Sequence, residues 1–157
     1  MAELADKGFM LPPGQGRSID LGNFAMSVKA TEEQTGGHFS LLEATEPADF
    51  GPPLHIHRDA SESFYVLEGA YTVFLDQRQF TCPAGSFVFI PAGTPHSFRV
   101  SAETGRKLVL FTTASLVGYF EDLSTAIHAD RADPEALSAI AAEYSMEVLG
   151  PVPAGYL

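Results

Sequence analysis

Four residues, His55, His57, Glu62 and His96, have the side-chain types and the spacing of a metal site. His55 and His57 are two positions apart in a segment that we expect to be extended, so in a β-strand both imidazoles leave the same face. Glu62 follows a short bend, and His96 follows a rigid Pro/Gly turn at 91–95 that can aim it inward. Because imidazole nitrogen and carboxylate oxygen are ligands of first-row divalent metals, we predict that these residues bind one divalent transition metal.

These ligand types do not determine the metal, and nickel, iron, manganese, cobalt and zinc all remain candidates. Four side chains would fill the coordination of a tetrahedral zinc ion, whereas an octahedral ion would keep open positions, which favours catalysis. The alternative interpretation is that the four residues are hydrogen-bonded polar groups in a site without metal.

The residues around this group predict a series of short strands. Alternating apolar residues predict a strand over 18–30, and after a turn ending in a Gly-Gly pair a second strand is expected over 38–45. Further strands are expected at 55–57, 63–67, 71–75, 79–82, 87–90, 96–100 and 107–113. Gly69 is expected to end one strand, and a polar loop at 101–105 to separate the last two. About ten strands at this spacing indicate an all-β fold, either a closed barrel or a double sheet.

The pattern changes in the segment 115–145, which predicts two helices. Ser115 is the expected N-cap of the first helix, one face of which carries Leu116, Phe120, Leu123 and Ile127. Asp133 and Pro134 are the expected N-cap and first residue of the second helix. We expect both helices to cap the barrel or to cover its outer face, and the prolines of the tail at 150–153 to keep it extended.

Composition limits the classes of partner. The 157 residues suit one domain, and 20 acidic against 9 basic residues give a formal net charge of −11. This charge disfavours nucleic acid and anionic membranes, so a small molecule is the expected partner. No apolar run is long enough to span a membrane and no secretory signal is visible, which predicts a cytoplasmic protein. Cys82, the single cysteine, is interpreted as a small core residue.

Two segments resemble the two motifs of the cupin superfamily. The first, 51–69, contains Gly51, the His-Ile-His triplet, Glu62 and Gly69, and the second, 85–100, contains Gly85, a Pro-Ala-Gly turn and His96. Fewer residues separate Gly51 from His55 than in the family pattern, and a valine ends the second motif where the family often has Asn. The resemblance implies a single cupin domain over 1–157, a double-stranded β-helix (jelly-roll barrel) with two C-terminal α-helices. It also implies that the two histidines of the triplet, Glu62 and His96 are the metal ligands.

Within this superfamily the chain resembles single-domain proteins related to quercetin 2,3-dioxygenase. That resemblance implies a metal-dependent dioxygenase, an oxidoreductase that joins O2 to an aromatic or enolic small molecule, with Glu62 as both ligand and catalytic base. One alternative is a non-redox polyketide cyclase or isomerase with a Lewis-acid metal, and another is a non-catalytic cupin that binds a small molecule.

The sequence also predicts residues of a substrate pocket and the assembly of the protein. Phe64 and Val66 share the face of Glu62 in a regular strand, and Phe98 shares that of His96, so these three residues are predicted either to line a substrate pocket or to belong to an ordinary barrel core. The Pro-rich arm at 1–16 and the outer strands are expected to dock on a second subunit, giving a homodimer as is common among similar cupins.

Overall fold

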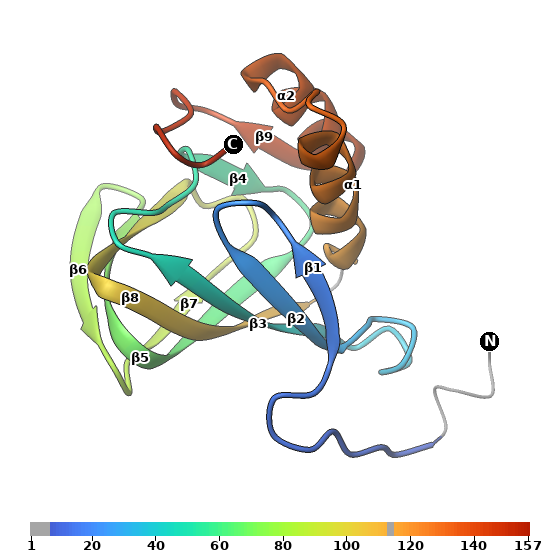
Figure 1. Ribbon diagram of the computed structural model, residues 1–157. Coiled ribbons are helices and arrows are strands. Elements are labelled where there is room, and N and C mark those ends of the chain that lie inside the picture. Colours follow the sequence, from blue (N-terminus) through green and yellow to red (C-terminus); the bar gives the residue numbers. More distant parts are fainter. Residues whose placement is uncertain (1–6, 113–114) are drawn as a thin grey trace.

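The computed structural model describes residues 7–112 and 115–157, which form a jelly-roll-like β-barrel with two helices beside it (Figure 1). The strands of these described residues are β1 (Arg17–Asp20), β2 (Ala25–Ala30), β3 (Ser40–Pro47), β4 (His55–His57), β5 (Ser61–Leu75), β6 (Arg78–Pro83), β7 (Phe87–Ile90), β8 (His96–Thr112) and β9 (Met146–Val148). The helices are α1 (Val117–His128) and α2 (Pro134–Glu143). The predicted all-β jelly roll with two C-terminal helices is therefore confirmed.

The long strand β8 is paired with three other strands of the barrel. It pairs antiparallel with β3 along one edge and with β5 along the other, and its first residue, His96, pairs with His55 of β4. β5 in turn pairs with β6 and β7. One strand thus connects most of the sheet and also begins at a predicted metal ligand.

The prediction that a strand ends at Gly69 is wrong. β5 continues through this residue to Leu75, and its register with β8 shifts between Gly69 and Tyr71. Gly69 has a φ of +74°, a left-handed conformation that costs glycine little. The glycine therefore accommodates a bulge inside a strand, where the local sequence suggested a terminus.

Two other strand predictions need correction. The polar segment 101–105 is part of β8 and not a loop, because Thr104 and Gly105 pair with the end of β3. The single strand predicted over 18–30 is two antiparallel strands, β1 and β2. They are joined by a tight turn in which the Gly22 N–H donates to Asp20 Oδ1 at 2.9 Å.

The C-terminal segment supports the short strand β4. Helix α2 begins as predicted, with Asp133 Oδ1 accepting from the Ala136 N–H at 2.7 Å. The N-cap of α1 is Leu116, without a side-chain hydrogen bond, and not the predicted Ser115. β9, which the sequence did not reveal, follows α2 and pairs with β4, so the three residues of β4 lie between β8 and β9. None of the described helices is long and apolar enough to cross a membrane.

We predict that Gly69→Ala destabilises the barrel more than Gly85→Ala. Both glycines have positive φ, 74° and 91°, so either alanine is strained by about 1–2 kcal/mol. A Cβ on Gly69 would in addition overlap the Thr104 carbonyl oxygen, whereas a Cβ on Gly85 meets nothing within 4 Å. Urea unfolding of the two variants measures the difference, and equal losses would contradict the close approach of β5 to β8.

Candidate metal centre and its pocket

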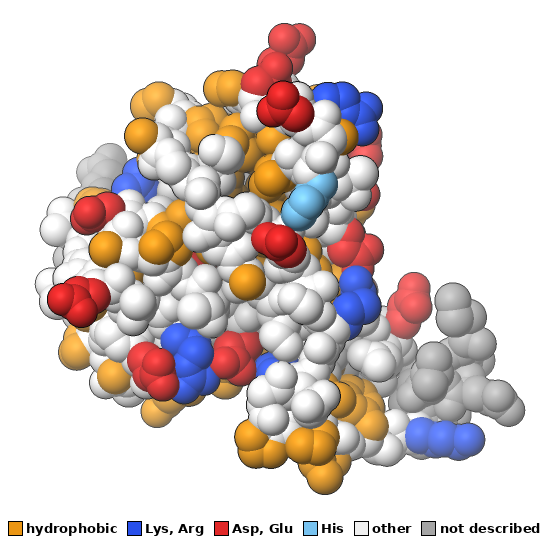
Figure 2. All heavy atoms as spheres, viewed as in Figure 1, with side chains coloured by type: hydrophobic (Ala, Val, Ile, Leu, Met, Phe, Trp, Pro, Cys, Tyr) orange, Lys and Arg blue, Asp and Glu red, His pale blue; other side chains and the backbone are white. Residues whose placement is uncertain are grey.

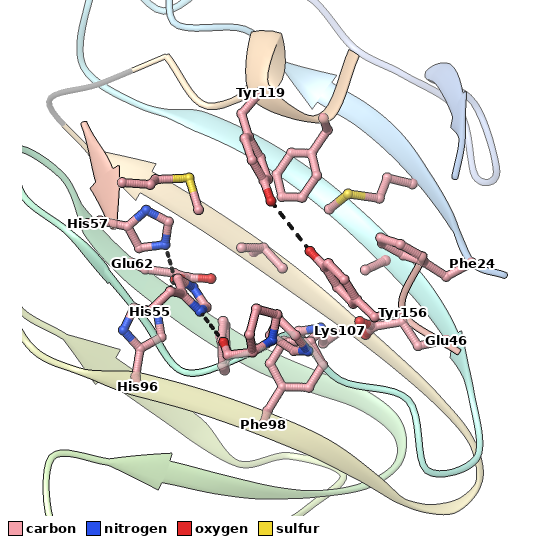
Figure 3. Close-up of a pocket in the computed structure, with 18 of the residues that line it drawn as sticks. Phe24, Glu46, His55, His57, Glu62, His96, Phe98, Lys107, Tyr119 and Tyr156 are labelled. Atoms are coloured by element: carbon pink, nitrogen blue, oxygen red, sulfur yellow. Dashed lines mark hydrogen bonds and ion pairs between the residues drawn. The ribbon is translucent and has the colours of Figure 1, made fainter. Parts of the chain in front are cut away.

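The four predicted ligands come together at one buried point. His55 and His57 extend from β4, Glu62 from β5 and His96 from the start of β8, and they are 7, 4, 6 and 1% exposed. One ligand atom from each residue lies within 4.8 Å of those of the other three. The close-up in Figure 3 shows the three rings and the carboxylate turned toward one another at one end of a pocket.

The hydrogen bonds around the rings leave the Nε2 atoms directed at this point. His55 Nδ1 lies 2.8 Å from the Pro53 carbonyl oxygen and His96 Nδ1 lies 2.8 Å from that of Thr94. Since a carbonyl only accepts, both Nδ1 atoms carry the proton and donate. In the neutral ring Nε2 then holds the lone pair, as metal-binding imidazoles require.

Glu62 is the only acid in the described cluster, and one of its oxygens contacts two rings. Oε2 lies 2.9 Å from His96 Nε2 and 3.1 Å from His57 Nε2. The His57 contact lacks hydrogen-bond geometry, and neither ring nitrogen of His57 has a hydrogen-bond partner among the described residues. A buried imidazole without such a partner, beside a carboxylate and two further imidazoles, fits a metal ligand.

Burial and mutual contact set the protonation of the cluster. Burial, with the neighbouring rings His96 and His57, lowers the pKa of His55 to about 3. For Glu62, burial alone would raise the pKa, but its close contacts and charge interactions with His57 and His96 hold the pKa well below its usual range. For His96, burial opposes the charge, but the hydrogen bond and charge of Glu62 raise the pKa above 6.5. Near neutral pH the Glu62 carboxylate is thus ionised and His55 is neutral, and His96 binds a proton more readily than His55.

The pocket beside the cluster is mostly apolar and aromatic. Of the predicted lining residues, Phe64 and Phe98 line it, while Val66 is packed in the core, 1% exposed, and does not. Its other aromatic walls come from several elements: Phe24, Phe50, Phe111, Tyr119, Phe120 and Tyr156.

Four polar residues of the pocket were missed in the sequence. Tyr119 of α1 and Tyr156 of the tail place their hydroxyl oxygens 3.5 Å apart, and burial raises the pKa of Tyr119 to about 12. Glu46 and Lys107 are buried on β3 and β8. The sequence could have revealed Glu46 and Lys107, because each occupies a position of its strand where the alternating pattern places buried residues.

Comparison with known proteins agrees with this geometry. A family model described as a cupin domain matches residues 41–112. Quercetin 2,3-dioxygenase of Bacillus subtilis (strain 168) is 32% identical over 111 residues, which are 71% of this chain. The chain belongs to the cupin family.

A further relative and two solved structures are also similar to this chain. An uncharacterized protein of Methanocaldococcus jannaschii is 39% identical over 57 residues, 36% of this chain and 46% of that protein. The structure of KdgF from Halomonas sp. superposes with a TM-score of 0.62 at 16% identity, covering 68% of this chain and 94% of that one. The structure of DMSP lyase DddQ from Ruegeria pomeroyi superposes with a TM-score of 0.51 at 25% identity, covering 57% of this chain and 47% of that one.

The Bacillus relative is much longer than the shared region. The matched segment covers 33% of that dioxygenase, so this cupin spans about a third of its length. The similarity therefore identifies the family and not the reaction.

We predict that uptake of a divalent metal near pH 6 releases the proton of His96. Because the pKa of His96 is raised, this ring is protonated there, and affinity falls as the pH drops through its titration. His55, with a pKa of about 3, has no proton to release. Calorimetry in buffers of different ionisation enthalpy measures the released proton. His55→Asn should keep this proton release, whereas an unchanged release in His96→Asn would contradict the assignment.

Proposed function

We propose that this cupin binds one divalent transition metal through His55, His57, Glu62 and His96 and acts as a dioxygenase on an aromatic or enolic small molecule. The observation that carries the proposal is the position of the four-ligand cluster, which is buried at one end of an aromatic pocket. The 32% identity to quercetin 2,3-dioxygenase of Bacillus subtilis supports this choice of reaction.

Each part of the site has a role in this proposal. The bound metal would supply Lewis acidity and, if redox-active, a path for electrons between the substrate and O2. Glu62 uses Oε2 for its contacts with His57 and His96, so we assign Oε1 to the substrate hydroxyl, whose proton it accepts. The aromatic walls would stack against a planar substrate and exclude water from the site.

The main alternative is a reaction without O2, such as a cyclisation, isomerisation or elimination with the metal as Lewis acid. The similarity to a DMSP lyase, 25% identical with a TM-score of 0.51, favours keeping this alternative. A cupin that binds a small molecule without converting it is the third possibility.

An oxygen-electrode assay of metal-loaded protein with flavonols and simpler enols tests the proposal. Oxygen uptake and the incorporation of both atoms of labelled O2 into the product are expected. Product formation under nitrogen would overturn the dioxygenase proposal in favour of the Lewis-acid alternative, and binding without any product would indicate a binding protein.

We predict that Glu62→Gln lowers kcat by about 100- to 10,000-fold, the usual contribution of a general base, while most metal is retained by the three imidazoles. The matched control is Glu68→Gln on the same strand, because Glu68 is exposed and pairs with Arg106. Metal analysis beside steady-state kinetics separates the outcomes. Loss of metal would make Glu62 mainly a ligand, and full activity would exclude it as the base.

We also propose a homodimer in which the N-terminal arm docks on a second copy. Within this arm, Phe9, Met10 and Leu11 are 51, 78 and 40% exposed. Figure 2 shows hydrophobic side chains gathered at the bottom of the view, where the described part of the arm runs in Figure 1. Such a concentration of apolar surface is typical of an interaction site.

Light scattering is expected to report a dimer, and Phe9→Ser/Met10→Ser to shift it toward monomer. Leu149→Ser, which removes an apolar side chain of similar exposure, 43%, elsewhere on the surface, should leave the dimer intact. A wild-type monomer at high concentration would contradict the proposal.

A further inference from the structure

A second polar cluster, separate from the metal ligands, lies in the wall of the same pocket. Glu46 of β3 and Lys107 of β8 are each 2% exposed and form an ion pair through Glu46 Oε1. The same oxygen accepts a hydrogen bond from the Tyr71 hydroxyl at 2.8 Å. Both charged residues line the pocket, and Figure 3 shows them on the opposite side from the histidine rings.

The buried positive charge of Lys107 has several stabilising partners. Its Nζ lies 3.8 Å from the ring centroid of Phe98, 4.8 Å from that of Tyr71 and 5.3 Å from that of Phe64. Ring faces attract a buried ammonium, and Glu46 neutralises it. The positive charge therefore has partners on several sides.

In the Glu46 carboxylate, in contrast, only one of the two oxygens has partners among the described residues. Glu46 Oε2 is buried and has no hydrogen-bond partner among the described residues, although both donors, Tyr71 and Lys107, converge on Oε1. An unpaired carboxylate oxygen in an apolar wall is destabilising, and a buried ion pair can often be replaced by apolar residues without loss of stability. Folding alone thus gives no reason for this acceptor in the pocket.

The strand register places Lys107, the ion-pair partner of this acceptor, well away from Glu62. Glu62 pairs with Phe111 on β8, and Lys107 lies four residues earlier on the same strand, a separation of about 13 Å between backbone positions. Phe111, Val109 and Lys107 alternate along this strand and all line the pocket. Tyr156 also lines this pocket, and its hydroxyl oxygen lies 3.5 Å from that of Tyr119.

We propose that Glu46 Oε2 is a second ligand-binding group, which accepts a hydrogen bond from a hydroxyl on the part of the ligand that lies away from the metal centre. This inference rests on the proposed function for its ligand class and narrows that class to hydroxylated aromatic compounds with two polar ends. One hydroxyl binds at Glu62, the apolar body lies between the aromatic walls, and the other hydroxyl reaches Glu46.

The charges of Glu46 and Lys107 favour a neutral hydrogen-bond donor on the ligand. An ionised carboxylate paired with Lys107 only accepts hydrogen bonds, so an anionic group of the ligand finds no donor on Glu46. A cationic group would approach the Lys107 ammonium, and Glu46 is already neutralised by it. A hydroxyl avoids both problems and gains a charge-assisted hydrogen bond.

Anaerobic binding of two flavonols to metal-loaded protein tests the proposal. Quercetin carries distal hydroxyls, whereas 3-hydroxyflavone carries the enol hydroxyl but no other. We expect quercetin to bind about tenfold or more tightly to the wild type, as one hydrogen bond to a charged group provides. In Glu46→Leu/Lys107→Met, which removes the acceptor and both charges together, this preference should disappear while the affinity for 3-hydroxyflavone changes little.

Glu43→Gln is the matched control, because Glu43 lies on the same strand but pairs with Arg106 and Lys29 outside the pocket. It should keep the preference for quercetin. If the double variant does not fold, Glu46→Gln alone, measured for folding by circular dichroism, should weaken the preference for quercetin, because its neutral amide oxygen accepts a weaker hydrogen bond than the carboxylate. A preference that persists, an equal loss for both flavonols, or no flavonol binding to the wild type would overturn the proposal.

These outcomes are independent of turnover. If the preference depends on Glu46 but no oxygen is consumed, the dioxygenase proposal fails and the hydroxyl site stands. If oxygen is consumed with equal affinity for both flavonols, the hydroxyl site fails and the dioxygenase proposal stands.

Discussion

The structure depends on holding a buried carboxylate, Glu62, among three buried imidazoles. Removing such a charge from water is costly unless it is compensated, and here the compensation comes from His57 and His96, each within 3.1 Å of Oε2. The residues come from three strands, β4, β5 and β8, that are separated in the chain. The barrel therefore needs the pairing of β8 with both β4 and β5 to bring these side chains together.

The same strand geometry builds the pocket. Strand β8 begins at His96, a residue of the candidate metal cluster. Because side chains alternate along a strand, β8 then directs Phe98, Lys107, Val109 and Phe111 into the interior. The strands leave one side of this interior to be covered by other elements. Helix α1 and the tail supply Tyr119, Phe120 and Tyr156 there, so the C-terminal segment forms a wall of the pocket.

The sequence predicted the parts of this structure that short patterns determine. The four residues of the candidate metal cluster could be grouped because the His-x-His pair and the Pro/Gly turn before His96 are local features. Helix α2 was predicted because Asp133-Pro134 is a local start signal. β9 was missed because a three-residue strand gains its structure from pairing with β4, which local sequence does not record. The end predicted at Gly69 and the loop at 101–105 failed for a related reason: long-range pairing carries β5 and β8 through residues that elsewhere end strands.

The two buried carboxylates of the pocket, Glu46 and Glu62, have different charge partners. This difference favours one orientation of a bound ligand over the other. Glu46 has a cation from its own chain, Lys107, so a further cation gains little there. Among the described residues, the partners of the Glu62 carboxylate are the imidazoles of His57 and His96, and a proton on an imidazole can be exchanged for a metal. We therefore expect a divalent ion at one end and a neutral hydroxyl at the other. An elongated ligand that places an acidic enol at the metal end satisfies both carboxylates, whereas the reversed ligand leaves one of them without its preferred partner.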